Sequence, residues 1–130
     1  MWNLDDESKY IKIHSFKLPF VYTYGNQDKE KRERIRAKAA EGFPVILPKV
    51  KWWAFRIDLK KSGIRDFDAD NVPKLIVDAF SLKLIHKDRS KFLKLGLYED
   101  DILDFVRIIE IKGERSQIGD STDVEIFGCK

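Results

Sequence analysis

Three aspartates at alternate positions stand in the middle of the chain, directly before a segment with helical apolar spacing: Asp66, Asp68 and Asp70. In an extended segment, alternate side chains project to the same side. Carboxylates clustered in this way repel one another and lose hydration, and a bound cation offsets both costs. Hard oxygen ligands suit Mg²⁺, Mn²⁺ or Ca²⁺. The spacing therefore predicts a divalent-metal site among these aspartates.

A lysine and a second acidic segment extend this constellation. Lys74 follows Asp70 by four residues, so both side chains share one face of a helix. An ammonium group beside a bound metal holds a phosphate, stabilises the charge that develops on it or protonates a leaving oxygen. Asp100 and Asp101 stand at the entrance to a later predicted strand, where they are well placed to complete the cation site from another element. Together these residues predict chemistry on a phosphate backbone.

Each of these features also has a plainer explanation. Aspartates before a helix often act as N-caps, and we expect one of the three, or Asn71, to do so. Capping needs only one side chain, which leaves the others unexplained. Asp70 and Lys74 alone would form a surface ion pair worth about 0.3–0.5 kcal/mol. The acidic residues at 99–101 alone would be an ordinary polar turn.

The elements that must position these residues are predicted in the order β-α-β-α-β-β. We expect strands at 9–18, 49–59, 103–112 and 122–127, and helices at 28–41 and 72–85. Large apolar side chains on both faces of 49–59 predict a central strand, and 122–127 is expected to be the hairpin partner of 103–112. Residues 86–96 either extend the second helix or form a loop. The fold class is therefore α+β, a mixed sheet of about four strands with two main helices, in a single domain of residues 1–130.

The composition excludes several classes of protein. The one cysteine, Cys129, rules out an intramolecular disulfide and a cysteine-based zinc site, and His14 and His86 are too few for a histidine cluster. The chain has no apolar stretch of about 18 residues. Its acidic N-terminus lacks the basic start and apolar run of a signal peptide. We expect a soluble, cytoplasmic protein that does not enter a membrane.

Charge is unevenly distributed along the chain. Residues 1–65 hold 15 Lys and Arg against 8 Asp and Glu, whereas residues 66–130 hold 10 against 14. This distribution fits a protein whose basic half attracts phosphates and whose acidic half holds a cation. The alternative is a solvated surface of mixed charge. The predicted helix at 28–41 is correspondingly either solvated or phosphate-facing. Further phosphate contacts would come from basic residues at 49–51, 60–65 and 83–94.

Two motifs resemble a known family. They are Asp68-Ala69-Asp70-Asn71-Val72-Pro73-Lys74-Leu75-Ile76-Val77-Asp78-Ala79-Phe80 and Glu99-Asp100-Asp101-Ile102-Leu103. The first resembles the D-x-D-N-x-x-K-x-x-x-D-A-L signature of the RusA-type Holliday junction resolvases, and the second is similar to the later D-D-x-Q-V segment of that family. The resemblance covers roughly residues 50–127. The stretch between the two motifs, 83–96 included, is basic and longer than expected for the family.

The resemblance implies a RusA-like fold and a homodimer that resolves four-way DNA junctions by paired nicking in DNA recombination and repair, with Mg²⁺ or, in its place, Mn²⁺. It implies Asp68 and Asp70 as catalytic metal ligands, Asp100 as the third ligand with Asp101 as the alternative, and Lys74 as the catalytic lysine. It also implies a phage or prophage as one origin. Two other functions stay open: a non-catalytic nucleic-acid-binding module, and a nuclease that cuts another branched DNA such as a flap.

Overall fold

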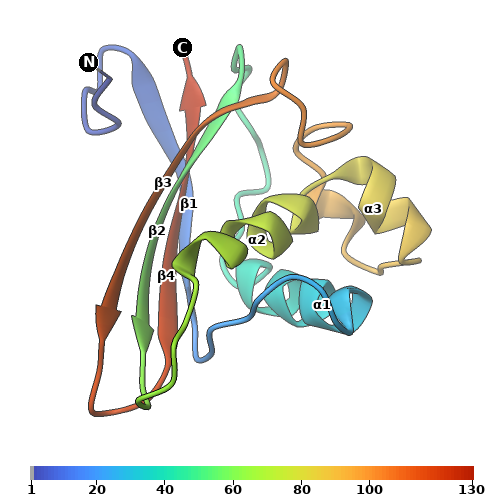
Figure 1. The fold of residues 1–130 in the computed structure, drawn as a ribbon. Coiled ribbons are helices and arrows are strands. Elements are labelled where there is room, and N and C mark those ends of the chain that lie inside the picture. Colours follow the sequence, from blue (N-terminus) through green and yellow to red (C-terminus); the bar gives the residue numbers. More distant parts are fainter. Residues whose placement is uncertain (1) are drawn as a thin grey trace.

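The computed structural model describes residues 2–130 and contains one four-stranded sheet with helices on one face (Figure 1). The strands are β1 (Tyr10–Leu18), β2 (Trp53–Lys61), β3 (Val106–Arg115) and β4 (Ser121–Cys129). The helices are α1 (Asp28–Ala39), α2 (Pro73–Ala79) and α3 (Leu82–Lys87), with short 3-10 helices η1 (Ala69–Asn71) and η2 (Leu93–Leu95). The predicted α+β class and mixed sheet are confirmed.

The strand order is β1-β4-β2-β3, in which β4 pairs antiparallel with β1 and β2 while β3 pairs parallel with β2. The predicted hairpin between the last two strands is therefore wrong. Burial explains the observed order, because β4 is buried at most of its positions and β3 is exposed along its second half. The more buried strand takes the interior position, and the more polar one takes the edge.

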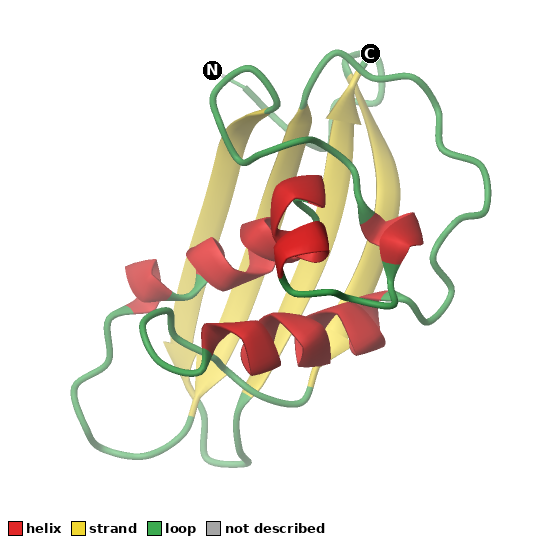
Figure 2. Ribbon diagram, turned by 90° about the vertical axis from the view of Figure 1, so that its right-hand side faces the viewer, coloured by secondary structure: helices red, strands yellow, loops and turns green. Residues whose placement is uncertain are grey.

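The core lies between the sheet and the layer of helices, which lies in front of the sheet in Figure 2. Phe55 and Ile57 of β2, Ile35 of α1 and Leu75 of α2 are fully buried there. The opposite face of the sheet carries a smaller cluster that includes Ala54. Strand β2 therefore packs on both faces, which confirms its predicted central position.

The predicted helix at 72–85 is instead two helices, which meet at Phe80 and Ser81. Ser81 has an extended backbone and caps α3, since its side-chain oxygen accepts a hydrogen bond from the Leu84 amide at 3.4 Å. The Leu97 amide donates to the Phe80 carbonyl at 2.9 Å. These contacts bind the backbone of the junction to a distant part of the chain and break a continuous apolar stripe. No helix within residues 2–130 is long and apolar enough to cross a membrane.

Helix α1 forms close to its predicted bounds, but two of its arginines do not face solvent. Arg36 is fully buried and Arg32 nearly so. Both donate to the carboxylate of Asp88, just beyond α3, at 2.7–3.0 Å, and Arg36 also donates to the Ala79 carbonyl at 2.8 Å. Neither alternative for this helix, solvated or phosphate-facing, applies to these two arginines, which instead join α1 to the ends of α2 and α3.

Candidate active site

The second acidic segment, which includes Asp100 and Asp101, packs beside α2 and the start of α3. The Leu82 amide donates to the Tyr98 carbonyl at 2.8 Å, and the Lys83 amide donates to the Glu99 carbonyl at 3.1 Å. The buried Tyr98 hydroxyl donates to the Val77 carbonyl at 2.5 Å. These bonds fix Tyr98 and Glu99 against the C-terminal part of α2 and the start of α3, and so hold Asp100 and Asp101 nearby.

Lys74 lies between two carboxylates, one from each of the two motifs. Its Nζ is 3.1 Å from Oδ2 of Asp78, one turn further along α2, and 3.1 Å from Oδ2 of Asp101. The Asp78 side chain is only 4 % exposed and the Asp101 side chain 27 %, whereas the Lys74 side chain is 45 % exposed. The ammonium group therefore neutralises a largely buried pair of carboxylates and still faces solvent.

The protonation of this trio is tuned by its surroundings. Burial raises the pKa of Asp78 to about 6; Lys74 lowers it, and the negative charge of Asp101 raises it further. Burial alone would raise the pKa of Asp101, but hydrogen bonds with Lys74 and Asp78 hold that pKa below its ordinary value. Partial burial opposes the charge of Lys74, yet its two carboxylate partners raise its pKa. The site thus holds a group that exchanges a proton close to neutral pH.

These residues line an open cleft of about 490 Å³ between the three helices and the acidic segment. Asp78, Asp100 and Asp101 lie in it together with Lys74, and other charged side chains reach it from α1 and α3: Asp28, Arg32, Lys83 and Lys87. Acidic groups are thus accompanied by exposed lysines of α2 and α3, an arrangement that suits a phosphate approaching a site with negative charges, whereas Arg32 is already paired with Asp88.

The two aspartates of the second motif have different surroundings. The Oδ2 atom of Asp100 is 3.5 Å from Nζ of Lys83, whose side chain is 66 % exposed. The other carboxylate oxygen of Asp100 accepts a hydrogen bond from the backbone amide of Asp101 at 2.9 Å. Asp101 itself turns toward Lys74 and Asp78. Of the two aspartates, Asp101 is therefore the one in contact with the first motif.

Asp68 and Asp70 lie at η1 and are exposed. Neither they nor Asn71 caps a helix through its side chain: η1 and α2 both begin without a side-chain cap. The prediction that one of these residues caps the helix is therefore wrong. Within residues 2–130 the side chains of Asp68 and Asp70 form no hydrogen bond or ion pair, and they line no part of the cleft that holds Asp100.

The candidate ligands fit Mg²⁺ in their chemistry but are not gathered around one point. All are carboxylates, the ligands that Mg²⁺ prefers. In the part of the chain that the structure describes, no three Asp, Glu, His or Cys side chains lie close enough to hold one ion. Asp68 and Asp70 stand apart from Asp100, and Lys74 lies against Asp101. The three-aspartate metal site stays a prediction.

Two groups of residues in or near the cleft were not anticipated as parts of a site. In the sequence, Asp78 stands out only as part of the first motif, although Asp78 follows Lys74 by four residues, the same spacing that links Asp70 to Lys74. The Arg32–Asp88 pair also had a signal, because Asp88 is the only acid within 83–96. Arg32 and Arg36 stand at i and i+4 on the apolar face of α1. Charged residues at such positions indicate a buried ion pair.

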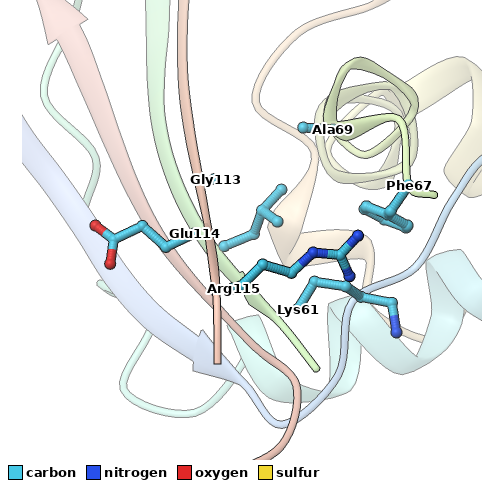
Figure 3. Close-up of a pocket in the computed structure, with 7 residues that line it drawn as sticks. Lys61, Phe67, Ala69, Gly113, Glu114 and Arg115 are labelled. Carbon is cyan, nitrogen blue, oxygen red and sulfur yellow. The ribbon is translucent and has the colours of Figure 1, made fainter. Parts of the chain in front are cut away.

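A second, smaller hollow lies at the far end of β2 and β3. It measures about 250 Å³ and is lined by Leu59, Lys61, Phe67, Ala69, Gly113, Glu114 and Arg115. Figure 3 shows Arg115 and Lys61 pointing to the side of Phe67, while Glu114 points the opposite way. A Cβ atom at Gly113 would lie 3.4 Å from Leu59 Cδ1 and 3.6 Å from Ala69 Cβ. The hollow has no acid–base pair of the kind found in the cleft.

No protein-family model matches the chain, and no curated protein is similar to it in sequence.

Proposed function

We propose that this chain is a Mg²⁺-dependent endonuclease that cuts branched DNA, with the four-way junction as its substrate. The observation that carries the proposal is the 3.1 Å contact between Lys74 and Asp101. It joins the two motifs that resemble the RusA-type resolvases, at a cleft that also holds the basic side chains Lys83 and Lys87 of α3. Two motifs unrelated in function would not be expected to contact each other through one lysine.

In this proposal Asp68 and Asp70 hold the metal ion together with a third carboxylate, Asp101 or Asp100. A Mg²⁺ ion bound by these residues would supply an activated water and polarise the scissile phosphate. Lys74 is the residue that stabilises negative charge on the phosphate, since its ammonium group is exposed on one side. Asp78 holds Lys74 in position, because its buried carboxylate binds the ammonium group on the side away from solvent.

The contacts favour Asp101 over Asp100 as the third carboxylate. Asp101 touches Lys74 directly, whereas Asp100 is paired with the exposed Lys83 at 3.5 Å. The basic side chains at the cleft, Lys83 and Lys87, would contact the DNA backbone without reading its sequence. Substrate choice would then depend on the shape of the DNA.

Cleavage of a labelled four-way junction in Mg²⁺ tests the proposal. Asp70→Asn, Lys74→Met and Asp101→Asn are each expected to reduce the rate by about 100-fold or more, since each removes a group that acts on the phosphate or the metal. Asp100→Asn is the matched comparison and should cost clearly less. Asp123→Asn, an exposed carboxylate on β4, should leave the rate unchanged.

Three results would decide against the proposal or narrow it. If Asp70→Asn cuts as well as the wild type, the metal site is wrong. If the chain binds junctions equally well with and without Mg²⁺ and cuts none, it is a non-catalytic binding module. A panel of junction, flap and plain duplex separates the remaining cases, because faster cutting of the flap would assign another branched substrate.

A further inference from the structure

An apolar groove lies between the loop that follows α1 and the segment around η2. It measures about 700 Å³ and is lined from both segments. The large apolar side chains that line it are Phe43, Val45, Leu47, Phe92, Leu93 and Leu95. Among residues 2–130, none lines both this groove and the cleft that holds Lys74. The groove is therefore a second surface of the molecule, separate from the candidate active site.

Some of the apolar side chains at the groove are strongly exposed. Val45 and Leu93 are 95 % and 58 % exposed, and Ile46, the neighbour of Val45 in the chain, is 85 % exposed. Leu95, which also lines the groove, is buried. A large continuous apolar surface of this kind marks a site where a partner binds. A small apolar molecule would fill the hollow but leave Ile46 in water, so the exposure favours a larger partner.

Hydrogen bonds hold both walls of the groove against α1. The Phe43 amide donates to the carbonyl of Ala40, just after α1, at 3.2 Å. On the other wall, the Ser90 hydroxyl donates to the carboxylate of Glu33 in α1 at 2.6 Å, and the Phe92 amide donates to the Ser90 hydroxyl at 3.1 Å. The groove is therefore formed without an occupant. A preformed groove loses less conformational entropy when it binds a partner.

The charge around the groove is almost entirely positive. The two segments that form it, residues 40–51 and 89–96, contain five cations against the single acid Glu41: Lys49, Lys51, Arg89, Lys91 and Lys94. All five are exposed, and Lys91 and Lys94 line the groove itself. Within residues 2–130, none of the five forms an ion pair. A partner that covers the apolar walls thus meets positive charge that the chain does not neutralise, and acidic groups complement it.

The aromatic side chains of the groove are poorly placed to stack on nucleobases. The ammonium group of Lys91 lies 5.3 Å from the centre of the Phe92 ring, over its face. His14 packs at a steep angle against Phe43, with ring centres 5.1 Å apart. Single-stranded nucleic acid binds through open aromatic faces along a basic channel. The exposed Val45 and Leu93 would gain no contact of this kind, so the groove favours a peptide.

We propose that this groove binds a short acidic segment of another protein. Its bulky apolar side chains enter the groove between Phe43 and Phe92, and its carboxylates face Lys91 and Lys94. The apolar contacts supply the affinity, and the lysines select segments that carry negative charge. The proposal does not rest on the nuclease activity, because the groove and the cleft share no residue. Junction cleavage and peptide binding are therefore measured independently.

Peptide binding tests the charge of the occupant. The probe is the labelled peptide Glu-Asp-Leu-Asp-Glu-Phe-Leu-Asp-Asp, whose fluorescence anisotropy is followed with the whole chain. It should bind the wild type with a dissociation constant of about 100 μM or lower. Lys91→Glu and Lys94→Glu should each raise that constant roughly tenfold. Lys60→Glu makes the same charge change at an exposed position of β2 and should leave it unchanged.

A reversed peptide separates a change of charge from a loss of folding. The same peptide with Lys at every acidic position should bind the double variant K91E/K94E more tightly than it binds the wild type. A damaged groove would bind neither peptide. Circular dichroism of each variant verifies that it is folded.

Serine substitutions test the apolar walls. Val45→Ser and Leu93→Ser should each raise the dissociation constant of the acidic peptide roughly fivefold. Ile64→Ser is the matched control, because Ile64 is 99 % exposed on a different loop. A wild type that does not bind the acidic peptide, or that binds the lysine peptide equally well, would overturn the proposal. So would oligothymidylate that binds the wild type but not K91E/K94E, since the groove would then be a nucleic-acid site.

Discussion

At the scale of single residues, the Lys74–Asp78–Asp101 trio decides what the cleft is able to do. The fold buries Asp78 almost completely but supplies it with one ammonium partner and one neighbouring carboxylate. The result is an acid with a pKa of about 6 next to an exposed lysine. Such a group is sensitive to pH in the range where most enzymes work.

The titration of Asp78 predicts a pH-dependent stability. Its pKa in the folded chain, about 6, exceeds the ordinary value of 3.8. A raised pKa gives a contribution to stability that is full below pH 3.8 and is lost as the pH rises through 6. In urea unfolding without divalent cations, the wild type should therefore lose on the order of 2–3 kcal/mol relative to Asp78→Asn between about pH 4 and pH 7. A constant difference between the two proteins over this range would contradict the assignment.

The buried ion cluster of Asp88 gives a second prediction at this scale. Asp88→Ala leaves Arg32 and Arg36 buried without their shared counter-ion. Removal of one partner from a buried ion pair costs about 3–5 kcal/mol, because the remaining charge stays desolvated. Thermal or urea unfolding should show a loss of that order. Asp58→Ala, at an exposed position of β2, is the control and should change the stability by less than about 0.5 kcal/mol.

At the scale of elements, the segment before β2 is in close contact with the last strand. A Cβ atom at Gly128 of β4 would overlap Cγ1 of Val50 and would lie 2.8 Å from its Cβ. Gly128→Ala should therefore destabilise the chain by about 1–3 kcal/mol through overpacking. Val50→Ala removes the two nearest methyl groups, so the double variant should recover part of the loss. Additive losses in this double-mutant cycle would show that the contact is not the cause.

The elements also show which parts of the fold the sequence predicts. Local patterns are sufficient for the four strands, α1 and the central place of β2, because apolar spacing depends on neighbours along the chain. The strand order, the break at Ser81 and the burial of Arg36 depend on partners distant in sequence. Likewise, the motifs indicate Lys74 and the acidic pair Asp100 and Asp101. The burial of Asp78 beside Lys74 arises only when the helices pack.

At the scale of the whole molecule, positive charge is expected to govern the affinity for DNA. Lys83 and Lys87 line the cleft, whereas Lys94 lines a separate apolar groove. Replacing Lys83 and Lys87 by Gln should weaken binding to junctions and flatten the plot of log K against log salt, by roughly one unit of slope for each phosphate that is no longer neutralised. Lys94→Gln should leave the slope unchanged. Fluorescence anisotropy over a series of salt concentrations measures both effects.

The parallel pairing of β2 with β3 has a consequence for how the chain folds. Residues 62–105 form the single crossover between these two strands and carry both acidic motifs, α2 and α3. Loop closure of this length is slow compared with the formation of local contacts. We therefore expect β3 to pair with β2 late in folding, together with the assembly of the cleft from the crossover residues. In a folding chain, Lys74, Asp78 and Asp101 would reach their final positions only when β3 pairs with β2.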